Sequence, residues 1–203
     1  RPRGAGLTLY GVVRGAVRPL LRSVFRLEVA GQEHVPRHGA VVVVANHLSA
    51  LDPFVLGVAV PRELHFMAKE ELWRWRPVGW AVERVGGFPV ARGRSDNEAV
   101  ERAVDLLRAG HAVGIFPQGR VRTEGLWRRG AARLALATGA PIVPVRLFGT
   151  DRALAGRRVR ITRLRVAIGP PIAVAAEGPT LASAQELTES VRAAVESLQD
   201  PLS

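Results

Sequence analysis

The sequence predicts an α/β fold with a mostly parallel sheet that is flanked by helices, and three observations support this prediction. Short runs rich in β-branched residues alternate along the chain with longer segments of helical period, an order typical of parallel strands joined by helices. The 203 residues are 47% hydrophobic, which suffices for one core of ordinary size. No internal repeat, low-complexity tract or linker divides the chain.

The expected strands are short and apolar, as in a sheet that is buried on both faces. We place them at about residues 40–45, 64–68, 84–90, 112–116, 141–148 and 159–168. Helical patterns lie between them near 53–60, 70–82, 95–109 and 129–138, with a last helix near 180–198. Ser95 and Glu98 form a capping box at the start of the 95–109 helix, and Gly110 follows its end as a C-cap residue would.

Residues 7–27 predict an amphipathic helix with one basic stripe. Apolar residues fill most of its positions, and arginine recurs at every fourth one, at Arg14, Arg18, Arg22 and Arg26. Pro19 is expected to kink the helix. Such a helix can lie in a membrane interface with its guanidinium groups among anionic headgroups, or it can dock on its own domain with a solvated arginine face. We expect the first, and therefore predict an interfacial helix over 1–28 and the main domain over 29–203.

The charge of the chain predicts a polyanionic partner. The formal net charge is +11, and Lys69 is the only lysine among the 29 basic residues. Nucleic acid, an anionic membrane surface and a phosphate-bearing substrate all fit this charge. The aromatic content of 5% and the absence of an RNP-type aromatic pair or helix-turn-helix pattern disfavour nucleic acid. We therefore expect no nucleic-acid partner, although "RRVRITRLR" at 157–165 is a second basic run.

Residues that the sequence lacks exclude several kinds of site. There is no cysteine, so disulfides, thiolate metal sites and a cysteine nucleophile are all excluded. A metal hydrolase is disfavoured because the other histidines sit at no recognisable ligand spacing, at His34, His38, His65 and His111. We expect no metal site. No apolar run reaches the roughly 18 to 20 uncharged residues that a membrane-spanning helix needs.

The stretch "VVVVANHLSALDPF", residues 41–54, predicts the site. Its valine run ends where parallel sheets place their sites, at the carboxyl end of a strand. Asp52 followed by Pro53 is typical of a helix start, with Asp52 as the N-cap. On a continuous helix His47 and Asp52 would be about 140° apart, but a turn between strand and helix could fold the carboxylate back onto the imidazole. Asp52 would then fix one ring nitrogen as a donor and leave the other as a general base.

These residues resemble a known family. "NHLSALD" is similar to the His-four-residues-Asp motif of the glycerolipid acyltransferases, the family that includes 1-acylglycerol-3-phosphate acyltransferases. Three further blocks follow in the family's order: "GGFPVAR" at 86–92, "IFPQGRVRTEG" at 115–125 and "APIVPVRLFGT" at 140–150. The resemblance covers roughly residues 25–173. It implies a glycerol-phosphate acyltransferase-like fold, with 29–203 as the acyltransferase domain.

The resemblance also implies a reaction. His47 would deprotonate a hydroxyl of a lysophospholipid or glycerol-phosphate acceptor, with lysophosphatidic acid as the expected acceptor. The hydroxyl would then attack an acyl thioester, from acyl-CoA or acyl-carrier protein, and no cofactor is expected. Arg92 would bind phosphate, as the bidentate guanidinium suits that group. The enzyme of phospholipid biosynthesis so described would be peripheral or monotopic at the cytoplasmic face of the cell membrane.

The third block departs from the family pattern at two places. Gln118 stands where the family usually has Glu, and Arg120-Val121 stands where it usually has Thr-Arg. The substrate-binding arginine of this block would then be Arg120 or Arg122, or the block lacks one. Gln118 and Gly119 are also expected to bind substrate, with Gly119 allowing a close approach of backbone and ligand. Two alternatives stay open: a noncatalytic lipid-binding relative, or an acyltransferase for a different glycolipid or phospholipid acceptor.

Overall fold

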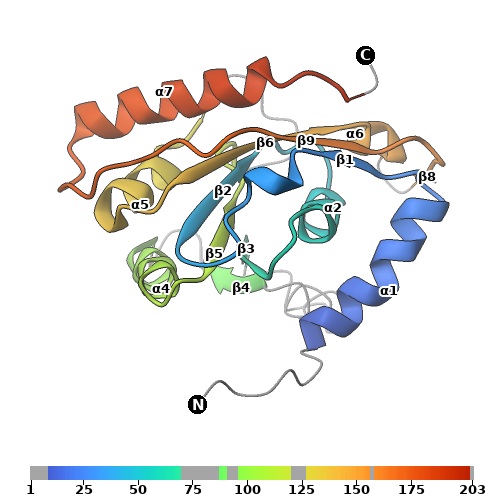
Figure 1. The fold of residues 1–203 in the computed structure, drawn as a ribbon, viewed down its shortest axis with the longest axis horizontal. Helices are drawn as coiled ribbons and strands as arrows, with labels where there is room; N and C mark the ends of the chain where they lie inside the picture. The colour runs from blue at the N-terminus through green and yellow to red at the C-terminus, as the bar shows by residue number, and fades with distance from the viewer. Residues whose placement is uncertain (1–8, 70–86, 91–95, 120–126, 156–157, 202–203) are drawn as a thin grey trace.

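The computed structural model describes residues 9–69, 87–90, 96–119, 127–155 and 158–201 (Figure 1). Within these ranges seven strands form one sheet in the order β1-β9-β6-β2-β5-β3-β4. Neighbouring strands are parallel except β6 and β9, which are antiparallel. Helices lie on both faces of the sheet, so the predicted mostly parallel α/β architecture is confirmed.

The predicted elements recur with small shifts in their ends. The strands of the sheet are β1 (Glu28–Ala30), β2 (Val41–Ala45), β3 (Leu64–Lys69), β4 (Gly87–Val90), β5 (Ala112–Ile115), β6 (Ile142–Phe148) and β9 (Arg165–Ile168). The helices are α1 (Leu9–Ser23), α2 (Asp52–Ala59), α4 (Asp96–Arg108), α5 (Gly130–Thr138), α6 (Thr150–Ala153) and α7 (Leu181–Ser197), with a 3-10 turn, η1 (Gln32–His34). The helix expected near 70–82 and the capping residue Ser95 lie outside the described residues.

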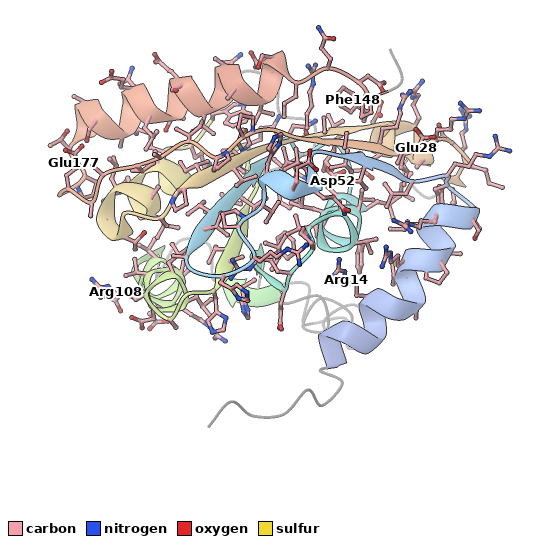
Figure 2. All side chains as sticks on the ribbon, viewed as in Figure 1. Arg14, Glu28, Asp52, Arg108, Phe148 and Glu177 are labelled. Atoms are coloured by element: carbon pink, nitrogen blue, oxygen red, sulfur yellow. The ribbon has the colours of Figure 1, made fainter. Side chains whose placement is uncertain are left out.

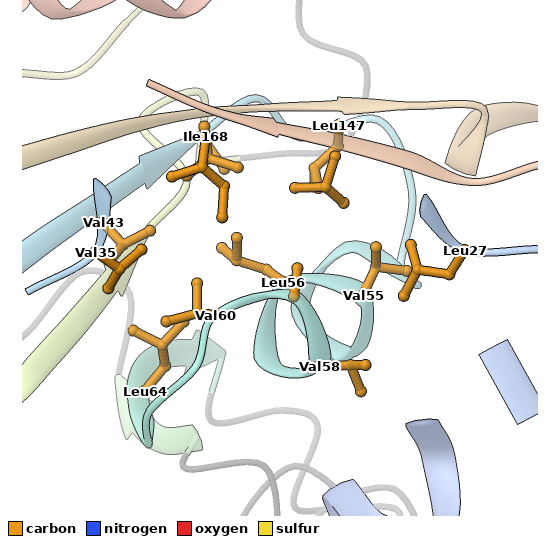
Figure 3. Close-up of a cluster of buried hydrophobic side chains, with 14 of the residues drawn as sticks. Leu27, Val35, Val43, Val55, Leu56, Val58, Val60, Leu64, Leu147 and Ile168 are labelled. Carbon is orange, nitrogen blue, oxygen red and sulfur yellow. The ribbon is translucent and has the colours of Figure 1, made fainter. Parts of the chain in front are cut away.

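The valines of β2 divide the core into two layers. Val41 and Val43 belong to the larger cluster, which includes α2 (Figure 3), whereas Val42 and Val44 belong to a second cluster with α4, α5 and α7. This division follows from the alternation of side chains along a strand. All four valines are completely buried, and each such burial stabilises the fold by about 1.5 to 3 kcal/mol. The strand that leads into the site is therefore held firmly from both faces.

Two features of the sheet differ from the prediction. β1 was not predicted, since its three residues carry no distinctive apolar run; it pairs with β9 in parallel. The strand expected over 159–168 is two separate strands. β8 (Arg158–Val159) pairs with β7 (Leu154–Ala155) in an antiparallel hairpin, and the chain rejoins the sheet only at β9. The β-branched residues Val159 and Ile161, which suggested a buried strand, are exposed.

Helix α4 ends close to Gly110, as the sequence predicts. Gly110 has a φ of 81°, in the left-handed region that glycine adopts readily. Its N–H donates to the carbonyl of Leu107, and the N–H of His111 donates to the carbonyl of Leu106, both at 2.9 Å. Both bonds satisfy carbonyls of the last helical turn, so the predicted C-cap role of Gly110 is confirmed.

Helix α1 docks on the domain beside α2 (Figure 1). Leu21, near its end, and Phe25, just beyond it, are buried in the larger core cluster. Arg14 donates to the carbonyl of Val58 in α2 at 3.4 Å, while the remaining arginines of the stripe are exposed, at Arg18, Arg22 and Arg26. Pro19 lies inside the helix as expected, and the membrane role of α1 stays a prediction. Among the described residues no helix is both long and apolar enough to cross a membrane.

The amino-terminal edge of the sheet carries a half-buried histidine. His65, the second residue of β3, lies edge-on to His111 with 5.1 Å between ring centroids. Burial lowers the pKa of His65 below its ordinary value; His111 and Arg102 lower it further, and Glu63 opposes the shift. His65 is therefore held in its neutral form over more of the acidic range than a free histidine.

Candidate active site

The carboxyl end of β2 is tied to β6 by Asn46. The Asn46 side chain donates from Nδ2 to the carbonyl of Leu147 at 3.0 Å, and its Oδ1 accepts from the N–H of Leu147 at 2.7 Å. Since β2 and β6 pair in parallel up to Ala45 and Val145, the amide continues the pattern of the sheet beyond the end of the strand. This pair of bonds fixes the backbone immediately before His47.

His47 and Asp52 lie in contact, as the spacing suggested. Oδ2 of Asp52 accepts a hydrogen bond from Nδ1 of His47 at 2.8 Å. The same oxygen accepts from the N–H of Leu48 at 2.6 Å and from the N–H of Ser49 at 2.7 Å. The Asp52 side chain is 0% exposed, whereas the imidazole is 16% exposed. A completely buried carboxylate with three donors on one oxygen thus orients a ring that reaches the surface.

The predicted N-cap role of Asp52 is wrong. α2 begins at Asp52 itself, the N-cap position is Leu51, and no side chain caps the helix there. The carboxylate turns away from its own helix because the loop before it offers two N–H groups and an imidazole to one oxygen. Hydrogen bonds to a charged acceptor are stronger than those between neutral groups, which favours this arrangement.

The turn after β5 holds His47 from a second side. The Phe116 ring stacks on the imidazole with 4.4 Å between centroids and 24° between planes. Oε1 of Gln118 accepts from the N–H of His47 at 2.5 Å. The contact follows from the register of the sheet, because Val44 of β2 pairs with Ile115 of β5 and the residues that follow each strand meet. Neither contact was predicted, since the sequence shows the residues but not which strands are neighbours.

A glycine in β5 makes room for the aromatic stack. Phe66 of β3 stacks on Phe116 with 6.1 Å between centroids and 10° between planes. A Cβ added at Gly114 would overlap the Phe66 ring, lying 2.7 Å from its Cδ1. The absence of a side chain at Gly114 therefore lets Phe66 support Phe116, which in turn lies against His47.

Gly119 ends the same turn and requires glycine. Its φ is 66°, its N–H donates to the carbonyl of Phe116 at 3.0 Å, and an added Cβ would lie 3.2 Å from Nε of Arg128. The N–H of Arg128 donates to the carbonyl of Pro117 at 3.0 Å, so the chain returns to this turn after residue 127. Sequence reasoning missed Arg128, which has no motif to mark it.

The arginines expected to bind phosphate cannot be placed. Arg92, Arg120 and Arg122 lie outside the described residues, and so their convergence near His47 stays a prediction. In the part of the chain that the structure describes, no three His, Asp or Glu side chains gather as metal ligands would. The described site therefore consists of the His47–Asp52 pair and the turn that holds it (Figure 2 labels Asp52).

The fold and the site define a class of protein, an α/β enzyme whose site lies at the carboxyl edge of a mostly parallel sheet. In this site a buried carboxylate orients a partly exposed imidazole. Comparison with protein families makes the class specific. The model of the acyltransferase family matches residues 26–147, and the chain belongs to this family. The expectation of an acyltransferase is thereby confirmed.

Individual relatives agree with this membership. A 1-acyl-sn-glycerol-3-phosphate acyltransferase of Bacillus subtilis (strain 168) is 27% identical over 199 residues, which cover 96% of this chain and 98% of the relative. An enzyme of the same name from Borreliella burgdorferi is 30% identical over 131 residues; the match covers 62% of this chain and about half, 52%, of that longer relative. The crystal structure of the 1-acyl-sn-glycerophosphate (LPA) acyltransferase PlsC of Thermotoga maritima has a TM-score of 0.68 at 24% identity, covering 91% of this chain and 79% of that one. This likeness confirms the predicted fold.

Proposed function

We propose that the protein transfers a fatty acyl group from an acyl thioester to a hydroxyl of a lysophospholipid or glycerol phosphate, with lysophosphatidic acid as the main acceptor. The contact that carries this proposal is the 2.8 Å hydrogen bond between Nδ1 of His47 and the buried Oδ2 of Asp52. The names of the Bacillus and Borreliella relatives support the acceptor.

The geometry of the pair suits a general base. A carboxylate oxygen can only accept, so Nδ1 carries the ring hydrogen and Nε2 carries the lone pair. Nε2 takes the proton of the acceptor hydroxyl while the hydroxyl oxygen attacks the thioester carbonyl carbon. The tetrahedral intermediate then breaks its carbon–sulfur bond, and the leaving thiolate takes the proton from His47. General-base catalysis of this kind typically contributes about 10² to 10⁴ in rate.

Asp52 supports the charge that forms on His47. The imidazolium is cationic during the reaction, and the buried carboxylate lies against it in a setting of low polarity, where charges interact more strongly than in water. Leu48 and Ser49 hold the same oxygen through their N–H groups, so the carboxylate need not move when His47 takes up the proton.

The substrates account for the charge of the chain. Arg92, with Arg120 or Arg122, would bind the acceptor phosphate through paired N–H donors. The donor is acyl-CoA or acyl-carrier protein, both acidic partners for a protein of net charge +11. The thioester is already activated, so the reaction needs no cofactor. Because the acceptor and its product are membrane lipids, we place the enzyme at the cytoplasmic face of the cell membrane, peripheral or monotopic, with the exposed arginines of α1 as support.

Release of free thiol from palmitoyl-CoA tests the proposal. We expect release that depends on lysophosphatidic acid, exceeds release with lysophosphatidylcholine, and falls by about 10² to 10⁴ in His47→Ala. Lysophosphatidylcholine as the better acceptor would contradict the acceptor assignment. If no lysophospholipid or glycerol phosphate supports release, with acyl-CoA or with acyl-carrier protein, the protein is instead the noncatalytic lipid-binding relative.

A further inference from the structure

Exposed aliphatic residues lie on two adjoining segments at one corner of the molecule. Val159 is 67% and Ile161 is 79% exposed, on β8 and just after it, and Leu20 near the end of α1 is 53% exposed. Among the described residues only two other large hydrophobic side chains are exposed, Val100 and Leu181, and they lie on α4 and α7. Scattered single residues of this kind are ordinary, but three on adjoining segments call for an explanation.

Backbone hydrogen bonds hold these two segments together. The N–H of Leu164 donates to the carbonyl of Phe25, and the N–H of Glu28 donates to the carbonyl of Leu164, both at 3.0 Å. The N–H of Arg160 donates to the carbonyl of Ala153 at 2.9 Å, which anchors the hairpin. The end of α1 therefore lies beside the chain that follows β8, as Figure 1 also shows. We call this surface the α1–β8 corner, formed by Leu20, Arg26, Val159, Arg160, Ile161 and Arg163.

The corner carries positive charge without matching carboxylates. Arg26, Arg160 and Arg163 are exposed, and none of them forms an ion pair with another residue that the structure describes. The next arginine along the chain behaves differently, since Arg165 pairs with Asp200 at 2.9 Å. Arg165 is thus partnered, while Arg26, Arg160 and Arg163 face solvent.

The corner also lies at the edge of the sheet that carries His47. Asn46, directly before His47, bonds to Leu147 near the end of β6. The next residue of β6, Phe148, pairs with Arg165 at the start of β9, immediately after the corner segment. A surface that binds the corner would therefore meet the carboxyl edge of the sheet, where the acceptor must arrive.

We propose that the α1–β8 corner docks on an anionic lipid bilayer, with Val159 and Ile161 inserted among the headgroups and the arginines bound to lipid phosphates. This inference rests on the proposed function, because it explains how the site reaches an acceptor that resides in the membrane. An acidic protein surface would also match the arginines, and binding of acyl-carrier protein is therefore measured as the alternative outcome. Proteins bind single-stranded nucleic acid through aromatic side chains on which the bases stack, and the residues of the corner include no aromatic side chain. A bilayer interface matches both features.

Cosedimentation with vesicles tests the corner. We compare the wild type with Val159→Ser/Ile161→Ser on phosphatidylcholine vesicles with and without phosphatidylglycerol. Leu181→Ser is the matched control, because Leu181 is also 67% exposed but begins α7. The double variant should bind anionic vesicles about tenfold or more weakly, as expected for losing two inserted aliphatic side chains. The control should bind like the wild type. Equal loss in both variants, or none in the double variant, would overturn the proposal.

Activity on two forms of the acceptor separates this proposal from the proposed function. The double variant should keep the wild-type rate with a short-chain, water-soluble lysophosphatidic acid and lose rate only when the acceptor is embedded in anionic vesicles. If the wild type acylates neither form, the proposed function fails, while the vesicle binding still decides the corner. If the double variant binds vesicles normally but loses affinity for acidic acyl-carrier protein, the corner is a protein-docking surface and the membrane assignment is wrong.

Discussion

Replacing Asp52 by Asn tests the charge of the buried carboxylate while disturbing its surroundings least. Oδ2 accepts three hydrogen bonds, from Nδ1 of His47 and from the N–H groups of Leu48 and Ser49. An amide oxygen in the same place still accepts from these donors, but it carries no negative charge. Asp52→Ala would instead strip the acceptor from two backbone N–H groups, at about 1 to 3 kcal/mol each, and so confound activity with folding.

We expect Asp52→Asn to lower kcat by about 10³ to 10⁴, which corresponds to about 4 to 5.5 kcal/mol of transition-state stabilisation. The new NH₂ group takes the place of the buried Oδ1, which accepts no hydrogen bond from a described residue, so no existing bond is lost. The free energy of unfolding should therefore fall only by the cost of one buried NH₂ group without an acceptor, about 1 to 3 kcal/mol. Thiol release measures kcat, and urea unfolding measures stability.

The matched control is Asp105→Asn, which removes the same charge from an exposed position of α4. It should leave both quantities unchanged. If Asp52→Asn retains a rate within a few-fold of the wild type while staying folded, the carboxylate does not support an imidazolium, and His47 is not the base that we propose.

Three further predictions concern the surroundings of the site and the far edge of the sheet. Gln118→Met removes the acceptor of the His47 N–H and should lower kcat by about tenfold or more with little change in KM. Gln118→Glu keeps an acceptor and should retain activity. Equal loss of activity in both variants would contradict the role of Gln118 in positioning His47. Gly114→Ala should displace the Phe66 ring and destabilise the fold by about 1 to 3 kcal/mol in urea unfolding, and unchanged stability would show that the ring is free to move. Burial lowers the pKa of His65 from its ordinary value of 6.5, so below about pH 6.5 the unfolded chain binds more protons than the folded protein. The free energy of unfolding should therefore fall as the pH is lowered from 7 to 5. His65→Phe should reduce this fall, and an equal fall in both proteins would contradict the assignment.

The fold was predictable where hydrophobic patterns are strong. β2, β3, β5 and β6 each carry compact apolar runs, and all lie within two residues of their expected places. The pattern could not reveal β1, whose three residues derive their strand character from β9. It also joined β8 to β9, because β-branched residues indicate an extended chain whether or not they are buried.

The core of the site was predictable for a different reason. Four residues separate His47 from Asp52, and a turn between the end of a strand and the start of a helix can bring the two side chains into contact. Phe116 and Gln118 were beyond prediction as partners of His47, because that contact depends on β5 lying beside β2. Strand order is set by packing of the whole sheet, and no local signal in either segment carries it.

The central claim is that His47 moves the proton of an acceptor hydroxyl during acyl transfer. The most direct measurement is the mass-spectrometric yield of phosphatidic acid from palmitoyl-CoA and lysophosphatidic acid, with wild type and His47→Ala that unfold at the same urea concentration. We expect phosphatidic acid from the wild type and a rate lower by about 10² to 10⁴ in the variant. Equal rates in the two proteins would contradict the mechanism.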